Sequence, residues 1–301
     1  MNTGKSQHTI PRFYLGQFLH PGWVYLRGAK HAKRVYSAKK VGVRDWYYSP
    51  PNDQQGLPFD DINKEIENSA APAYMQLLTA ENALIKDSKL YLAYFIANLA
   101  LRTPVVIEEA AAAMLDTMEK ADHMIHKMSE IHKSGVDPGP IDPGPGPSIK
   151  CTLKEWREAL TSMREEVNTG GKAMMDITMS IIPNLGPVIA KMSWMIMIAP
   201  ADSFFVTSDR PIVLTDLDGS PLGAGWAKSD AVGTLPLSPK RYLVLYGSPR
   251  GKWAYYKISR QEVAGLNSRT ISFAHSAIYS SEKYNPAEKW LQKGSRANNE
   301  S

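Results

Sequence analysis

Apolar residues recur every three or four positions through the middle of the chain, which is the spacing of one face of an α-helix. The pattern predicts a helix from Asp60 or Asp61 to about Glu81, and two more helices over residues 88–102 and 105–133. Another predicted helix contains Trp156 and Leu160. The apolar stretch 172–199 is interpreted as two buried helices joined at residues 184–187.

Short β-prone runs occupy both ends of the chain. Residues 23–26 and 34–37 flank a loop at 28–31 and predict a β-hairpin. Strands are also expected near the C-terminal end, at residues 203–207, 212–215, 242–246, 253–256 and 277–279, with a helix over 260–274. The order predicts an α+β fold, in which both β regions form one sheet or neighbouring sheets and the long helices pack against them.

We expect a single α+β domain over residues 1–284, followed by a polar, frayed tail at 285–301. The alternative is a helical domain inserted between two halves of a β domain. Residues 136–148 repeat an Asp-Pro-Gly-Pro unit, and predict an exposed, stiff loop because proline removes backbone donors and fixes the backbone.

Cysteine content and hydropathy indicate a cytoplasmic protein. Cys151 is the only cysteine, so the chain can form no internal disulfide. The longest apolar stretch, residues 174–200, is interrupted by Asp176, Pro183 and Lys191, and it does not have the roughly 20 nearly continuous apolar residues of a membrane helix. The first residues also show no secretory signal pattern.

Positive charge gathers in the first 50 residues, which hold nine lysines and arginines against one acid, in a chain of net charge +5. Such a region attracts phosphates and nucleic acid. The alternative is a solvated hairpin whose lysines discourage edge-to-edge strand pairing. The basic residues that we expect to contribute to binding are Lys30, Lys33, Arg34, Lys39 and Lys40.

A series of short motifs resembles a known family. The chain opens on His8-Thr9-Ile10-Pro11 and later carries Ser208-Asp209-Arg210-Pro211. Between and after them stand Ile66-Glu67, Leu101-Arg102-Thr103-Pro104, residues 235–239, Asn267 and residues 277–280. In this order, over roughly residues 8–280, the series resembles the bacterial and phage family called domain of unknown function 4238. The resemblance implies one domain and no particular activity.

The candidate catalytic residues are His8, Asp209 and Glu67. A histidine acts as a general acid or base near neutral pH, and a carboxylate at the end of a strand can orient it. Each residue also has a structural alternative. His8 would fasten the N-terminus, Asp209 would bond backbone in a turn, and Glu67 would form a buried salt bridge with Arg102.

The candidate substrate-binding residues are Arg12, Tyr14, Arg102, Ser208 and Asn267. Arg102 follows a predicted helix, where its planar guanidinium could bind a phosphate. The alternative is that it complements the helix dipole.

No metal site is predicted, and the sequence leaves the cofactor unknown. His123, His126 and Glu130 share a helix face, but the histidine spacing is three rather than the four of a His-Glu-x-x-His metal site. The sequence also lacks the phosphate-binding and dinucleotide-binding glycine motifs and the Gly-x-Ser-x-Gly nucleophile turn.

Two functions therefore stay open. The first is an enzyme acting on nucleic acid or nucleotide phosphates, with a cleft that gathers His8, Glu67, Arg102 and Asp209. The second is a non-catalytic module that binds nucleic acid, another phosphate-bearing ligand or a protein through the basic N-terminal surface. The sequence does not fix the oligomeric state.

Overall fold

The computed structural model describes residues 6–45, 47, 59–79, 86–133, 153–169, 171–221, 225–247 and 253–296. The chain divides into two compact units. The sheet unit comprises Met1–Val105 and Thr178–Ser301, and the helical unit comprises Val106–Ile177. The predicted loop at 136–148 lies outside the described residues.

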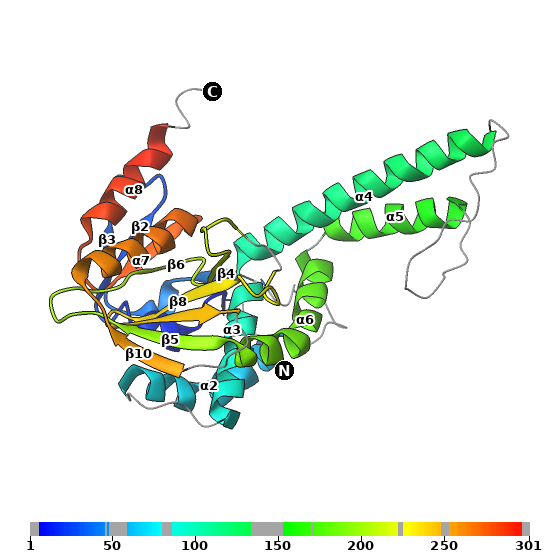
Figure 1. Ribbon diagram of the computed structural model, residues 1–301. Coiled ribbons are helices and arrows are strands. Elements are labelled where there is room, and N and C mark those ends of the chain that lie inside the picture. Colours follow the sequence, from blue (N-terminus) through cyan, green and yellow to red (C-terminus); the bar gives the residue numbers. More distant parts are fainter. Residues whose placement is uncertain are drawn as a thin grey trace. The chain divides into compact units, whose positions relative to one another are not determined.

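A four-stranded sheet in the sheet unit joins the two ends of the chain (Figure 1). Its order is β3-β2-β11-β6, and every neighbouring pair is antiparallel. The strands are β2 (Gly22–Leu26), β3 (Lys33–Val35), β6 (Thr207–Ser208) and β11 (Ala277–Ser280). The predicted hairpin is confirmed, and so is the prediction that N-terminal and C-terminal strands share a sheet.

A five-stranded sheet, of order β10-β5-β9-β8-β7, forms from the C-terminal half alone. Only β10 and β5 run parallel; the remaining pairs are antiparallel. Its strands are β5 (Ser193–Ile198), β7 (Val213–Thr215), β8 (Val232–Ser238), β9 (Arg241–Tyr246) and β10 (Trp253–Lys257). A small third sheet pairs β1 (Ser6–His8) with β4 (Val43–Asp45).

Helices alternate with these strands along the chain and confirm the α+β prediction (Figure 1). The predicted middle helices are α2 (Phe59–Thr79), α3 (Lys86–Leu101) and α4 (Pro104–Lys133). The short elements α1 (Arg12–Gly16) and η1 (Ala38–Lys40) flank the hairpin in sequence, and α7 is Arg260–Phe273. The Ser259 side chain and Glu262 form a capping box that starts α7.

The core forms where helices meet the sheets. Val263 of α7 packs with Tyr242 and Val244 of β9. At the other sheet, Tyr25 of β2 and Ile278 of β11 pack against α8 (Asn285–Arg296). The Phe13 ring of α1 meets the Tyr74 and Phe95 rings of α2 and α3, with centroids 5.2 and 5.3 Å away.

The prediction of two helices over 172–199 is wrong. One helix, α6 (Gly171–Lys191), runs through both Pro183 and Pro187, and the apolar segment after it is strand β5. An apolar run of this kind does not by itself distinguish a buried helix from a buried strand. Gly186 allows α6 to approach α3 closely, because a Cβ there would lie 2.4 Å from Cδ1 of Tyr94 on α3.

Two further elements differ from the prediction. Strand β8 was not expected, since proline normally argues against an inner strand; Pro236 is accommodated where the β8–β9 register shifts between Pro236 and Ser238. The expected frayed tail is wrong over residues 285–296, which form α8. The buried Ala287 and Leu291 hold this helix against the four-stranded sheet.

The helical unit contains most of α4 together with α5 (Leu153–Thr169). Nη2 of Arg157 on α5 donates to Oγ of Ser129 on α4 at 3.1 Å. A helical segment between two sheet-forming parts corresponds to the alternative domain organisation, although α2 and α3 belong to the sheet unit. The single domain over 1–284 stays a prediction.

No single helix among the described residues has both the length and the apolar character needed to cross a membrane. One bent pair, residues 87–101 with 104–131, passes that test only when the two helices are taken together.

Candidate functional site

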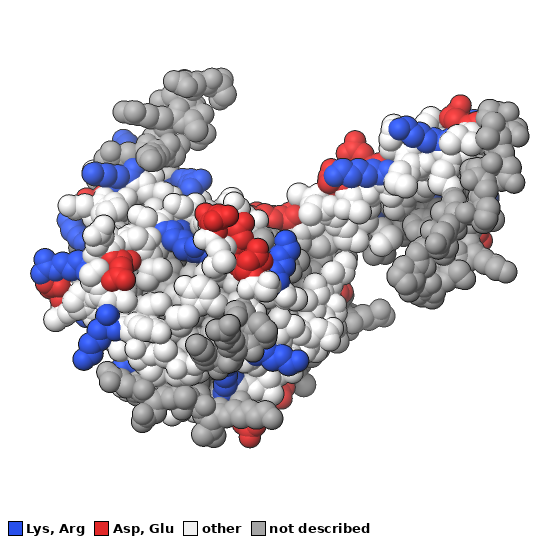
Figure 2. Space-filling model, viewed as in Figure 1, with Lys and Arg blue, Asp and Glu red and all other residues white. Residues whose placement is uncertain are grey.

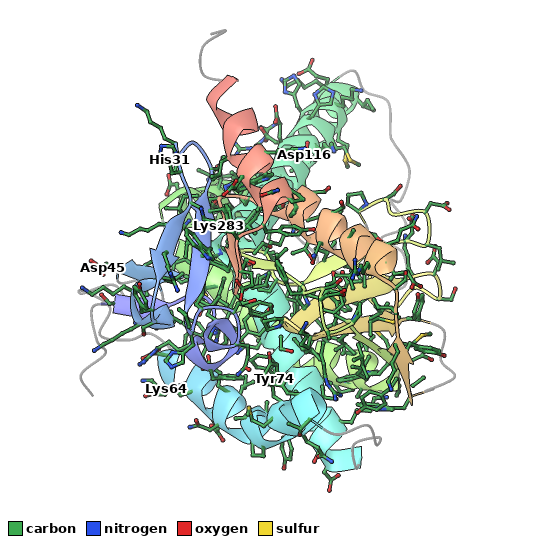
Figure 3. All side chains as sticks on the ribbon, turned by 90° about the vertical axis from the view of Figure 1, so that its left-hand side faces the viewer. His31, Asp45, Lys64, Tyr74, Asp116 and Lys283 are labelled. Carbon is green, nitrogen blue, oxygen red and sulfur yellow. The ribbon has the colours of Figure 1, made fainter. Side chains whose placement is uncertain are left out.

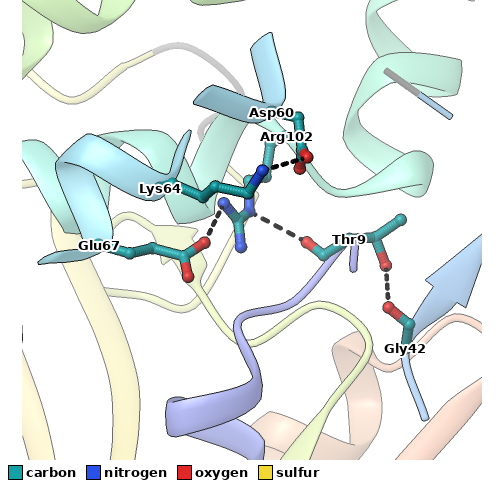
Figure 4. Close-up of polar contacts among 6 residues, drawn as sticks. All are labelled: Thr9, Gly42, Asp60, Lys64, Glu67 and Arg102. Atoms are coloured by element: carbon teal, nitrogen blue, oxygen red, sulfur yellow. Dashed lines mark hydrogen bonds and ion pairs between the residues drawn. The ribbon is translucent and has the colours of Figure 1, made fainter. Parts of the chain in front are cut away.

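Arg102, just after α3, is the centre of a buried polar cluster (Figure 4). Only 1% of the residue is exposed. Its Nη1 lies 2.7 Å from Oε1 of Glu67 on α2, and its Nε donates to the carbonyl oxygen of Thr9 at 3.2 Å. Arg102 thus joins the α2–α3 helix pair to the N-terminal segment. The buried salt bridge that the sequence analysis gave as the alternative role of Glu67 and Arg102 is confirmed.

His8 ends strand β1, one residue before Thr9, and is partly buried. Burial lowers the pKa of its imidazole, and the positive charges of Arg12 and Arg102 lower it further. A hydrogen bond with the Val41 backbone and the charge of Asp60 oppose the shift. The net effect keeps the ring neutral at pH 7, the state in which an imidazole can accept a proton.

Asp209 follows β6 and supports a turn in the four-stranded sheet. Its carboxylate accepts hydrogen bonds from the backbone N–H groups of His275 and Ser276, at 3.0 and 2.7 Å, and from Oγ of Ser276 at 2.6 Å. The carboxylate therefore fixes the connection between α7 and β11. These hydrogen bonds reach the backbone of a turn that is distant in sequence. The structural alternative had instead predicted bonds to the backbone of the turn that contains Asp209.

Three of the predicted substrate-binding residues are buried and bonded to protein groups. Tyr14 shares a 2.6 Å hydrogen bond with Thr207 and donates to the Pro236 carbonyl. Asn267 accepts from the Val206 N–H and donates to the Phe204 carbonyl. Ser208 exchanges hydrogen bonds with the Arg210 backbone.

These contacts give the three side chains a structural role, and burial leaves them no surface to offer a substrate. Arg102 is enclosed in the same way. Arg12 differs, because it is exposed on α1 and acts electrostatically on His8. The structure thus gathers His8, Glu67 and Arg102 around the N-terminal segment, while Asp209 and Asn267 hold the C-terminal sheet connections.

A second feature, the hairpin groove, lies on one face of the β2–β3 hairpin and has a volume of about 590 Å³. Val24 of β2 pairs with Tyr279 of β11 and with Lys33 of β3, so these side chains stand on the same face. Segment 37–42, which contains η1, supplies further lining residues. The full lining is Val24, Leu26, Lys33, Val35, Tyr36, Ser37, Lys39, Lys40, Val41, Gly42 and Tyr279.

The hairpin groove combines an apolar lining with cationic side chains. Its lysines are Lys33, Lys39 and Lys40, all exposed. The Tyr36 residue is 70% exposed, and the Arg34 guanidinium lies 5.4 Å from the centroid of its ring. An exposed aromatic ring beside several cations can stack on a planar ligand while the cations meet phosphates.

Sequence reasoning identified these lysines but missed the groove. The signal was present in β2 and β3, where Val24, Leu26 and Val35 alternate with side chains of the other face. The position of η1 beside the hairpin is a tertiary feature, which periodicity does not reveal.

The visible face of the sheet unit carries acidic and basic side chains side by side (Figure 2). This face has no large area in which the charged side chains are all of one sign. On this face, an attraction for anions would need a local arrangement of cations.

In the helical unit, His123 and His126 line a cavity of about 990 Å³ together with Asp116, Glu119 and Arg157. Across the described residues, no group of three or more histidine, cysteine, aspartate or glutamate side chains is placed to hold a metal ion.

Comparison with known proteins identifies a family and no relative of known function. No curated protein and no solved structure matches the chain. The family described as Protein of unknown function (DUF4238) matches residues 6–284. This span includes Arg102, the hairpin groove and both large sheets, and it ends before α8. The chain therefore belongs to the DUF4238 family of proteins of unknown function.

Proposed function

We propose that this protein binds single-stranded nucleic acid through the hairpin groove. The observation that carries the proposal is the grouping of three lysines and one exposed tyrosine around an apolar floor. The cytoplasmic location expected from the lone cysteine belongs to the same proposal.

The chemistry of the groove favours a single strand over a duplex. Bases of a single strand are free to stack on the Tyr36 ring and to cover the apolar side chains of Val24, Leu26 and Val35. A duplex hides its bases and presents mainly phosphates. The three lysines then meet the phosphates of the strand, which makes the affinity dependent on salt.

The experiment is fluorescence anisotropy with a labelled single-stranded oligonucleotide of mixed sequence. The test variant carries Lys33→Glu, Lys39→Glu and Lys40→Glu. We expect it to lose at least 10-fold in affinity, while Tyr36→Ala loses a similar factor from about 1–3 kcal/mol of stacking.

A matched control makes the same charge change elsewhere, with Lys191→Glu, Lys228→Glu and Lys257→Glu, all exposed and outside the groove. An equal loss of affinity in test and control would show that net charge alone governs binding. In that case the groove has no specific role.

A second candidate function, an enzyme acting on nucleic acid or nucleotide phosphates, is favoured by one observation. His8 has a lowered pKa and lies under the influence of Arg12, which is exposed and could meet a phosphate. A neutral imidazole in that position is suited to act as a general base.

The test is turnover of single-stranded oligonucleotides and nucleotides by the native protein and by a folded His8→Ala variant. Loss of turnover in the variant supports the enzyme. Turnover that the variant retains removes His8 from the mechanism.

A further inference from the structure

The hairpin has a second cavity on its opposite face, between the β2–β3 turn and the start of α8. We call it the hairpin–α8 cavity; its volume is about 300 Å³. Trp23 lines it, whereas the next residue of β2, Val24, lines the hairpin groove. Neighbouring residues of a strand point to opposite faces, so the two cavities are separate sites.

Basic side chains from two distant parts of the chain meet in this cavity. Lys30 and His31 come from the hairpin turn, and Lys283 comes from the segment before α8. Figure 3 shows His31 and Lys283 on the same side of the molecule. The Lys283 ammonium lies 4.9 Å from the centroid of the Trp23 ring, a cation–π contact that holds it at the cavity wall.

The lysines in this cavity outnumber the acids that line it. Among the described residues, no ion pair includes Lys30 or Lys283. Glu288 contributes a carboxylate to the lining, so two lysines face one acid there. A ligand that enters needs at least one negative charge to match them.

We propose that the hairpin–α8 cavity binds a hydroxyl-bearing phosphate monoester. The phosphate meets Lys30, His31 and Lys283, because a phosphate offers several strong acceptors to these donors. The Glu288 carboxylate repels a bare anion but accepts a hydrogen bond from a ligand hydroxyl. The ligand class is therefore a sugar phosphate, either free or as the phosphorylated 5′ end of a nucleic-acid strand.

The test uses calorimetric titration of the full chain with ribose 5-phosphate, inorganic phosphate and ribose. We expect ribose 5-phosphate to bind more tightly than either fragment. Lys30→Gln and Lys283→Gln should each lower the affinity for ribose 5-phosphate about 10-fold. Glu288→Gln should narrow the preference for ribose 5-phosphate over inorganic phosphate. Lys30 and Lys283 are exposed and Glu288 is half-buried. Circular dichroism checks that each variant is folded.

Three results would overturn the proposal: no binding of ribose 5-phosphate at millimolar concentration, affinity unchanged in both lysine variants, or Glu288→Gln leaving the preference unaltered. Loss of binding in the groove variant Lys33→Glu/Lys39→Glu/Lys40→Glu would contradict a separate site. Failure here leaves oligonucleotide binding at the groove untouched, so the two proposals fail independently.

A last arm identifies the source of the phosphate. Oligonucleotides with and without a 5′-phosphate are compared in the native protein and in Lys283→Gln. A 5′-phosphate that tightens binding only in the native protein assigns the cavity to strand ends. Equal affinity of the two oligonucleotides, with ribose 5-phosphate still bound, assigns it to a free sugar phosphate.

Discussion

Arg102 places a positive charge in the interior of the sheet unit, where an ion is stable only with partners. Glu67 supplies the counter-charge and Thr9 a carbonyl oxygen. The pair connects α2, α3 and the N-terminal segment (Figure 4). Its enclosure explains why a phosphate-binding role, which the sequence allows for Arg102, gives way to a structural one.

Glu67→Ala should lower the free energy of unfolding by about 3 kcal/mol, since it leaves a buried guanidinium without its counter-charge. The value is at the low end of the range for buried pairs because 23% of the Glu67 side chain is exposed. Urea denaturation measures it, with the exposed Glu65→Ala as control. Equal, small losses in the two variants would contradict the assignment.

His8 should make the protein less stable as the pH falls below about 6.5. Because its folded-state pKa is lowered, the folded state binds fewer protons there than the unfolded state, so stability present above that pH is lost as the ring becomes protonated. Urea denaturation at pH 7.5 and 5.5 should show a smaller drop for His8→Gln than for the native protein. A drop in His8→Gln equal to that of the native protein would refute the account.

At the scale of elements, the close approach of α6 to α3 depends on one glycine. Gly186→Ala should destabilise the protein by about 1–3 kcal/mol, the usual cost of overpacking, because the new methyl group collides with the Tyr94 ring. Thermal unfolding measures the effect. In the double variant Gly186→Ala/Tyr94→Ala, the added cost of Gly186→Ala should disappear.

The matched control is Gly265→Ala in α7, where nothing stands within 4 Å of the added methyl group. There alanine should stabilise the helix by roughly 0.5–1 kcal/mol. If both glycine substitutions stabilise the protein, the packing of α6 on Tyr94 is not as described.

Elements whose pattern is local were predicted well, and those set by tertiary contacts were not. The middle helices and the hairpin follow from spacing and turn residues alone. Strand β8 depends on a register shift around Pro236. Helix α8 depends on the packing of Ala287 and Leu291 against the four-stranded sheet. Strand β5 was missed because its apolar run fits a buried helix equally well.

At the scale of the whole molecule, one β-hairpin presents two differently built surfaces. Lys33, Lys39 and Lys40 border the hairpin groove, and Lys30 lines the hairpin–α8 cavity. The sequence identified these lysines as one basic region. It could not divide them, because the division follows from strand pairing with β11 and from the position of α8.

The structure likewise separates the candidate catalytic residues, which the sequence analysis placed in one cleft. His8, Glu67 and Arg102 come together because α2 and α3 pack on the N-terminal segment, a contact that spans many residues in the sequence. Asp209 has a different role in the α7–β11 connection. Residue type alone does not distinguish a carboxylate that holds a turn from one that serves a site.

The salt dependence of oligonucleotide binding tests the central claim most directly. Affinity for a single-stranded oligonucleotide is measured by anisotropy between 50 and 300 mM salt, in the native protein and in Lys33→Gln/Lys39→Gln/Lys40→Gln. Each phosphate contact contributes about −0.7 to the slope of log K against log salt. We predict a slope about 2 units shallower in the triple variant; an identical slope in both proteins would contradict binding at the groove.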